Sequence, residues 1–173
     1  IIGELETHNG GTGKSLAFGA LKHMRNVVEL SGKRKGSDRF LMQRVNVFTD
    51  IILVNDVSRY DSAENYYNYS ADDFTIERKY KNEVVIPASQ SPKLCMTTNH
   101  MLKRPEGNSS ERRLQEYEVS DYYSADRNPQ DEFGHSLFHD WDQLQWQLFD
   151  DFMIDCVQLY LQKGLIAPPK INI

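Results

Sequence analysis

The sequence predicts a three-layer α/β domain with a mostly parallel central sheet. Short apolar runs alternate along the chain with segments of helical periodicity, and the first run leads into the glycine-rich stretch 9–13. Strands that alternate with helices usually form a parallel sheet with helices on both faces. With 173 residues, the chain is long enough for one core of ordinary size and hardly long enough for two.

Four apolar or β-rich runs are expected to form strands, at residues 1–5, 27–30, 51–54 and 93–98. The run 51–54 (Ile-Ile-Leu-Val) is apolar on both faces, which favours a central parallel strand over a surface strand. Apolar residues recur at helical spacing in 15–25, and this spacing predicts a helix that follows the glycine-rich stretch.

A hairpin and a long helix complete the predicted elements. Two β-rich runs, 74–76 and 84–86, flank the charged tip 77–83 and predict a β-hairpin. Apolar residues at helical spacing between residues 144 and 160 predict an amphipathic helix. This helix is expected to end at Gly164, because glycine favours the backbone conformation that terminates helices.

We expect residues 1–120 to form the core of the domain, with the hairpin inserted at about 74–86. Residues 121–173 are expected to form a helical extension packed on this core. The chain begins Ile1-Ile2-Gly3, with neither a Met nor a signal sequence. We therefore interpret the sequence as a fragment of a longer protein.

Composition places the chain among ordinary globular proteins. Apolar residues make up 39% and charged residues 26%, which excludes a disordered chain. No run approaches the ~18 consecutive apolar residues of a transmembrane helix, so no membrane partner is expected. Cys95 and Cys156 lie far apart among apolar residues, and we expect buried thiols in a reducing, cytoplasmic compartment.

Charge is unevenly distributed behind a formal net charge of −5. Residues 14–44 carry eight Lys and Arg against two acids, whereas residues 115–155 carry eleven acids against one Arg. A polyanion would therefore meet the first half of the chain and avoid the second. Two solvated faces of opposite sign would give the same pattern, so charge alone leaves both interpretations open.

A candidate phosphate-binding loop is the most specific motif, Asn9-Gly10-Gly11-Thr12-Gly13-Lys14-Ser15. In the pattern G-x-x-x-x-G-K-[ST], backbone N–H groups surround the β-phosphate of ATP, Lys14 reaches the β- and γ-phosphates, and the Ser15 hydroxyl ligates Mg²⁺. His8 occupies the first position in place of glycine, so the tight turn must be made differently. A glycine-rich turn that happens to precede Lys-Ser is the alternative.

Polar residues end the two strands expected at 51–54 and 93–98. Asn55-Asp56 follows the first, where ATP-hydrolysing proteins usually have two acids that hold Mg²⁺ or its water shell and activate the attacking water. Asp56 supplies the one charge, while Asn55 can still accept hydrogen bonds from Mg²⁺-bound water. Asn99 follows the second strand, where its amide could orient the attacking water at the γ-phosphate. Strand-ending turn residues are the simpler alternative for both positions.

These motifs, in this order, resemble the ATPase domain of the superfamily-3 helicases, and among these the poxvirus-type primase-helicases of phages, large DNA viruses and plasmids. The resemblance spans residues 1 to about 120. It is carried by Gly10–Ser15, Ile51–Asp56, Thr75-Ile76-Glu77-Arg78-Lys79-Tyr80-Lys81, Met96-Thr97-Thr98-Asn99 and Glu111-Arg112-Arg113-Leu114. It implies an AAA+-type P-loop NTPase fold with an inserted hairpin and a C-terminal helical tail, in a bacterial cell or phage-infected host.

The resemblance also implies partners and further site residues. Members form hexameric rings around single-stranded or forked DNA, sometimes with a primase domain upstream. A basic residue of the hairpin tip holds the DNA backbone, a position that Lys79 or Lys81 would occupy, with Arg78 and Tyr80 beside it. An arginine finger acts across the subunit boundary, and Arg112 or Arg113 is the candidate. An exposed, charge-rich turn and salt bridges to the acidic tail are the respective alternatives.

The expected function is therefore ATP-dependent translocation on single-stranded DNA during replication of a phage or mobile element, with ATP and Mg²⁺ as cofactors. A nucleotide-binding scaffold with weak or no hydrolysis remains an alternative because of Asn55. A monomeric P-loop phosphotransferase is a third possibility, although it would need neither the basic hairpin nor the Thr-Thr-Asn strand end.

Overall fold

The computed structural model describes residues 2–3, 13–120, 122–124 and 126–166. In chain order these residues form β1 (Ile2–Gly3), α1 (Lys14–Gly19), α2 (Leu21–Met24), β2 (Val27–Ser31), β3 (Ile51–Asn55), η1 (Ala63–Tyr66), α3 (Asn68–Ala71), β4 (Phe74–Ile76), β5 (Val84–Ile86), η2 (Ala88–Gln90), β6 (Lys93–Met96), α4 (Asn108–Arg113), β7 (Tyr117–Glu118), α5 (Pro129–Phe133) and α6 (Gln143–Lys163).

Three parallel strands form the central sheet in the order β2–β3–β6. The middle strand pairs on both edges, since Ile52 is opposite Val28 of β2 and Leu94 of β6. Ile52, Leu53 and Val54 are each at most 1% exposed. This confirms an α/β fold with a parallel sheet and a central strand at 51–54.

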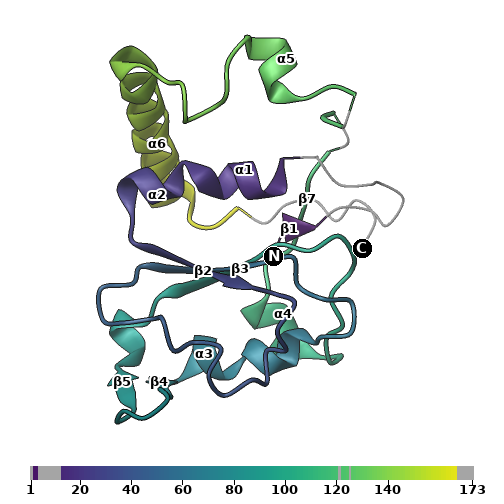
Figure 1. Cartoon of the computed structure of the whole chain (residues 1–173), viewed down its shortest axis with the longest axis vertical. Coiled ribbons are helices and arrows are strands. Elements are labelled where there is room, and N and C mark those ends of the chain that lie inside the picture. The colour runs from purple at the N-terminus through teal and green to yellow at the C-terminus, as the bar shows by residue number, and fades with distance from the viewer. Residues whose placement is uncertain (1, 4–12, 121, 125, 167–173) are drawn as a thin grey trace.

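Layers cover both faces of this sheet (Figure 1): α1, α2 and α6 lie on one side, and α3 with the β4–β5 hairpin lies on the other. Ile52 and Val54 belong to the main core on the α3 side. Because neighbouring residues of a strand point to opposite faces, Leu53 points toward the helices. Phe18 of α1 is likewise buried.

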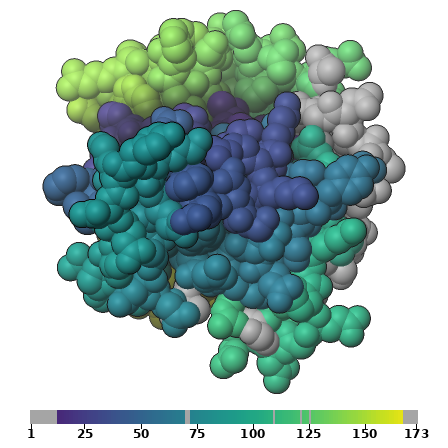
Figure 2. Space-filling model, turned by 60° about the horizontal axis from the view of Figure 1, so that its bottom comes forward, coloured from purple at the N-terminus to yellow at the C-terminus, as the bar shows by residue number. Residues whose placement is uncertain are grey.

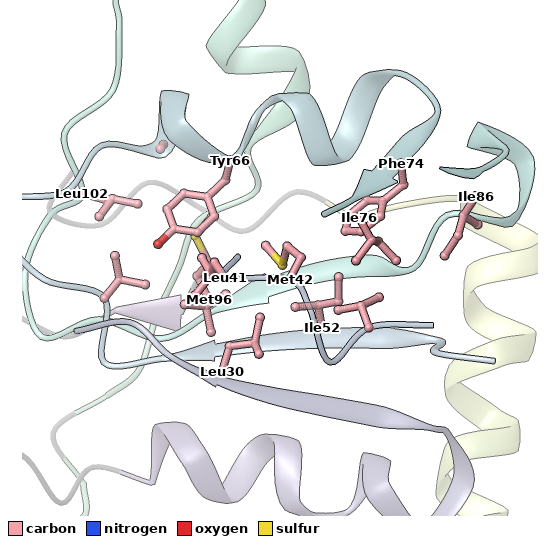
Figure 3. Close-up of a cluster of buried hydrophobic side chains, with 14 residues drawn as sticks. Leu30, Leu41, Met42, Ile52, Tyr66, Phe74, Ile76, Ile86, Met96 and Leu102 are labelled. Atoms are coloured by element: carbon pink, nitrogen blue, oxygen red, sulfur yellow. The ribbon is translucent and has the colours of Figure 1, made fainter. Parts of the chain in front are cut away.

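The main core lies between the sheet and the layer built from α3 and the hairpin (Figure 3). Strands contribute Leu30, Ile52 and Met96, and the hairpin contributes Phe74, Ile76 and Ile86. The long connection between β2 and β3 also enters this core, through Leu41, Met42 and Val45. That connection is therefore held in place by buried side chains, although it contains no helix or strand.

Two shorter pairings accompany the central sheet. β1 pairs in parallel with β7, so that Ile2 is opposite Tyr117. β4 and β5 pair antiparallel, with Phe74 opposite Ile86, which confirms the predicted hairpin.

The helix expected over 15–25 is present as α1 and α2, with Ala20 between them in a helical conformation (φ −65°, ψ −31°).

The predicted C-terminal helix is present as α6 and ends at Gly164, as its sequence indicates. The ring of Trp146 stacks on His23 of α2 at a centroid distance of 4.0 Å, and Phe149 is half-buried. Many apolar side chains of the same helix are exposed: Leu144, Leu148, Phe152, Ile154, Val157, Leu159, Tyr160 and Leu161. Among the described helices, none is long and apolar enough to cross a lipid bilayer.

A buried carboxylate ties the β2–β3 connection to the α3 layer. Asp61 is 3% exposed and accepts hydrogen bonds from the Gly36 N–H (2.7 Å), the Asn65 side chain (2.6 Å) and the Tyr66 hydroxyl (2.9 Å). Burial alone would raise the pKa of Asp61, but the hydrogen bonds, including one from the Ser62 N–H, outweigh it and lower the pKa.

Replacing Asp61 with Asn is expected to lower the free energy of unfolding at pH 7 by ~1–3 kcal/mol, because donors in this buried cluster lose their acceptor. The lowered pKa means that the charge of Asp61 stabilises the fold above the ordinary aspartate pKa of about 4. This contribution is lost as the pH falls toward the pKa in the folded state. Urea unfolding between pH 7 and pH 3 should therefore show a smaller acid-induced loss of stability in the variant. The exposed Asp72→Asn is the control, and equal pH dependence in variant and wild type would contradict the assignment.

Candidate functional site

The described part of the phosphate loop begins at Gly13, and its other predicted residues, Asn9, Gly10, Gly11 and Thr12, lie outside the described residues. Gly13 has φ +89°, a left-handed conformation in which a side chain would be strained. Lys14 follows as the first residue of α1 and is only 7% exposed, while Ser15 is exposed. A buried ammonium group requires acceptors or anions around it. Lys14 therefore places its positive charge inside the fold and not in the solvent.

The structure brings Asp56 and Asn99 together at one pocket of about 390 Å³. They follow β3 and β6, which are neighbours in the sheet, so their side chains emerge at the same edge. Lys33, Arg59 and His100 also line this pocket. Two cations beside one carboxylate give it the charge balance of a site for an anion.

Asn99 has a buried amide oxygen that accepts no hydrogen bond from the described residues. An unpaired buried acceptor costs free energy, and this oxygen is closed off from solvent, so a donor reaches it only if the side chain turns toward the pocket. Asn99 lines the same pocket as Asp56, which places its amide group beside the carboxylate.

Thr97 organises the tip of β3, a role that the motif analysis did not assign. It is fully buried, its hydroxyl accepts a hydrogen bond from the Asp56 N–H (3.1 Å), and it donates to the Asn55 side-chain oxygen (3.4 Å). Asp56 itself has φ +54°, a conformation that non-glycine residues adopt rarely. The side chain of Asn55 thus points to Thr97, and the hydroxyl fixes both residues that end the strand.

Gly32 allows the connection after β2 to approach this tip closely. A Cβ atom at this position would lie 2.5 Å from the backbone nitrogen of Val57 and 2.7 Å from the carbonyl oxygen of Asn55. The Gly32 N–H donates to that carbonyl (2.6 Å), and the Ser58 N–H donates to the Gly32 carbonyl (3.1 Å). These contacts bring Lys33 to the pocket of Asp56 and Asn99.

The predicted DNA-binding tip and the β2–β3 connection share a groove of about 450 Å³, on the face shown in Figure 2. Lys79, Tyr80 and Lys81 are exposed here. Phe40 of the connection lies beneath two cations, with the Lys79 Nζ 5.5 Å and the Arg39 Cζ 5.1 Å from its ring centroid. The groove therefore combines basic groups with aromatic surface, and Glu83 and Glu77, which pairs with Arg39, also line it.

Arg78 differs from its neighbours at the hairpin tip. It is half-buried, and its Nη2 donates to the carbonyl oxygen of Val45 (3.1 Å). Its Nε is buried without a hydrogen-bond partner among the described residues. Arg78 thus connects the hairpin to the β2–β3 connection, whereas the two lysines and Tyr80 extend into solvent.

The arginine-finger candidates, Arg112 and Arg113, lie exposed in the last turn of α4. The Nε of Arg112 donates to the carbonyl of Asn108 within the same helix (3.3 Å). Arg113 places its guanidinium 5.5 Å from the ring centroid of Tyr67. Neither arginine lines the pocket of Asp56 and Asn99 within its own chain.

A family model matches residues 5–113, more than half of the chain, and its description is "Family of unknown function (DUF5906)". The chain belongs to the DUF5906 family. The matched region includes the phosphate loop, both polar strand ends, the hairpin and the two arginines of α4. The candidate site of this DUF5906 protein therefore lies entirely within the part that the family shares, and α6 lies beyond it.

No curated protein shows significant similarity to the DUF5906 chain. A solved structure, the A form of the apo C-terminal region of NrS-1, is similar at 18% sequence identity with a TM-score of 0.44. The similarity covers 84% of the DUF5906 chain and 32% of the NrS-1 chain. The DUF5906 chain thus spans about a third of the length of the NrS-1 chain.

Replacing the buried Thr97 with Val is expected to destabilise the DUF5906 protein by ~1–3 kcal/mol, because the Asp56 N–H loses its acceptor while the shape of the side chain is kept. The exposed Thr75→Val in β4 is the matched control and should change the free energy of unfolding by no more than ~0.5 kcal/mol. Urea titration measures both, and equal effects would show that the Thr97 hydroxyl does not hold the strand tip.

Proposed function

We propose that this chain is the ATPase domain of a helicase or translocase that hydrolyses ATP to move on single-stranded DNA, in the replication of a phage or other mobile element. The observation that carries the proposal is the pocket in which Asp56 and Asn99 meet at the carboxyl edge of the sheet. A carboxylate and an amide at neighbouring strand ends are groups that can position and activate the water that attacks a bound nucleotide.

The donor set fits ATP and Mg²⁺. Magnesium prefers oxygen ligands, and the Ser15 hydroxyl and the Asp56 carboxylate are of this type. Lys14 would neutralise phosphate charge, and Lys33 and Arg59 add positive potential at the pocket of Asp56 and Asn99. The metal, when bound, would neutralise charge on the phosphates.

Asp56 and Asn99 have complementary roles in the proposed hydrolysis. The Asp56 carboxylate accepts a proton or hydrogen bond from the attacking water, and the Asn99 amide, at the same pocket, would orient that water. The Thr97 hydroxyl keeps Asp56 and Asn55 in place during the reaction. Since the side-chain oxygen of Asn55 already accepts a hydrogen bond from this hydroxyl, we assign Asn55 a positioning role.

DNA is the proposed polymer partner, and the hairpin tip is its proposed contact. Lys79 and Lys81 would bind phosphates, while Tyr80, fully exposed with φ +58°, offers a ring on which a base can stack. Assembly into a homo-oligomeric ring is part of the proposal. The exposed position of Arg112 and Arg113 is compatible with reaching the site of a neighbouring subunit.

The replacement of an acid by Asn55 keeps one alternative open, a nucleotide-binding scaffold with little hydrolysis. DNA-stimulated ATP turnover by the purified protein separates the two functions. Turnover that rises on addition of single-stranded DNA supports the translocase, whereas low turnover whatever DNA is added supports the scaffold.

Lys14→Ala is expected to reduce ATP hydrolysis by ~10²-fold or more and to weaken ATP binding, because the loop loses its cation. Lys22→Ala on α2 is the matched control. Lys22 is half-exposed and pairs with Glu29 at 2.7 Å, away from the phosphate loop. Steady-state ATPase rates and ATP titrations measure both variants, and wild-type hydrolysis in Lys14→Ala would refute the assignment of the loop.

The double variant Lys79→Ala/Lys81→Ala is expected to bind single-stranded DNA more weakly while basal ATP turnover stays near the wild-type rate. The slope of log affinity against log salt concentration should fall by about one unit for each DNA phosphate that the variant no longer binds. Lys22→Ala/Lys163→Ala removes the same charge from α2 and α6, at two residues that do not line the groove of the hairpin tip. If both double variants weaken binding equally, net charge and not the hairpin determines DNA affinity.

A further inference from the structure

An aromatic pocket of about 360 Å³ adjoins the phosphate loop and has no place in the function argued so far. Gly13, Leu16 and Ala17, from the start of α1, form one wall. Tyr122, Tyr123 and Phe138, from the chain that follows β7, form the other. This volume falls within the range of small-molecule sites, and apolar walls of this kind are typical of them.

Phe138 is held firmly in this pocket, at a conformational cost. It has φ +68°, which is rare and strained for a bulky residue. Its ring packs edge-on against Trp141 at 4.7 Å and against Phe149 at 6.1 Å. A Cβ atom on Gly19 would lie 3.2 Å from the Phe138 ring, so the ring lies directly on α1. The surrounding contacts therefore fix one wall of the pocket in advance.

The two tyrosines are also fixed in orientation. Their rings pack edge to face at a centroid distance of 4.9 Å. The Arg127 guanidinium lies 3.9 Å from the Tyr122 ring centroid and donates to its hydroxyl. Desolvation raises the pKa of Tyr123, and the neighbouring Glu132 carboxylate raises the pKa further. A tyrosine phenol is in any case neutral at physiological pH, and both tyrosines line the pocket.

We propose that this pocket binds the nucleobase of the nucleotide whose phosphates are held at Gly13–Ser15. The inference rests on the proposed function, because it requires a nucleotide at that loop. Gly13 lines the pocket and also belongs to the loop, so base and phosphate sites are contiguous along α1. Flat aromatic walls suit the stacking of a planar base.

The pocket also assigns a role to the segment after β7. Tyr122, Tyr123 and Phe138 lie beyond the region matched by the family model, which ends at residue 113. Base recognition is therefore supplied by the C-terminal part of the chain, and the phosphate-binding residues by the part that the family shares. Phe138 also packs against Phe149 of α6, so this wall of the pocket rests on that helix.

Calorimetric titration of the whole chain with MgATP and with magnesium tripolyphosphate tests this assignment. Base stacking should make ATP bind about tenfold or more tightly than tripolyphosphate. Ala17→Phe places a ring in the pocket, and Tyr123→Ala removes a wall from it. Each variant should lose most of the preference for ATP while its affinity for tripolyphosphate stays unchanged. Ala88→Phe, at an exposed site in η2, is the control and should keep the preference.

The outcomes distinguish the base site from the phosphate loop. If both pocket variants keep the preference for ATP, or if the wild type binds tripolyphosphate as tightly as ATP, the base site is overturned and the loop stands. If the wild type binds neither compound, the phosphate loop fails and the base site fails with it. Loss of preference in the pocket variants alone establishes the assignment.

Discussion

The rest of the structure depends on one constraint: β3 is buried on both faces and paired on both edges. Ile52 and Val54 complete the core shared with α3 and the hairpin, while Leu53 points to the opposite face, where Phe18 of α1 is also buried. A strand with these contacts cannot shift by one residue without exchanging its two faces. The strand therefore fixes where its carboxyl end emerges, and with it the position of Asp56.

The polar end of β3 is held by neighbours that are themselves fixed by the sheet. The parallel register of β3 and β6 places Thr97 beside the last residues of β3, where its hydroxyl meets Asn55 and Asp56. The absence of a side chain at Gly32 lets the connection after β2 lie against the same tip. The geometry of the candidate site is thus a consequence of sheet packing.

The elements that could be predicted from the sequence are those with a local signal. The apolar run at 51–54 indicates a central strand by itself, and the two β-rich runs around the tip 77–83 indicate the hairpin. Thr97 could not be assigned in this way, because its role depends on the register between two strands far apart in the sequence. The strained backbone of Phe138 could not be predicted from the sequence either, since only the packing around Trp141 and Phe149 explains it.

The sheet also separates part of the charge whose segregation is evident in the sequence. The basic groups of the β2–β3 connection and the hairpin lie on one side, and α5 and α6, which carry many of the acids, lie on the other (Figure 1). At physiological salt, interactions between exposed charges are largely screened beyond about 8–10 Å. The sheet with its covering layers is thicker than this, so the charges on its two sides act on a partner separately. A polyanion would therefore be repelled from α5 and α6. The charge distribution thus gives the protein a preferred side for such a partner, and it is the side on which Lys79 and Lys81 are exposed.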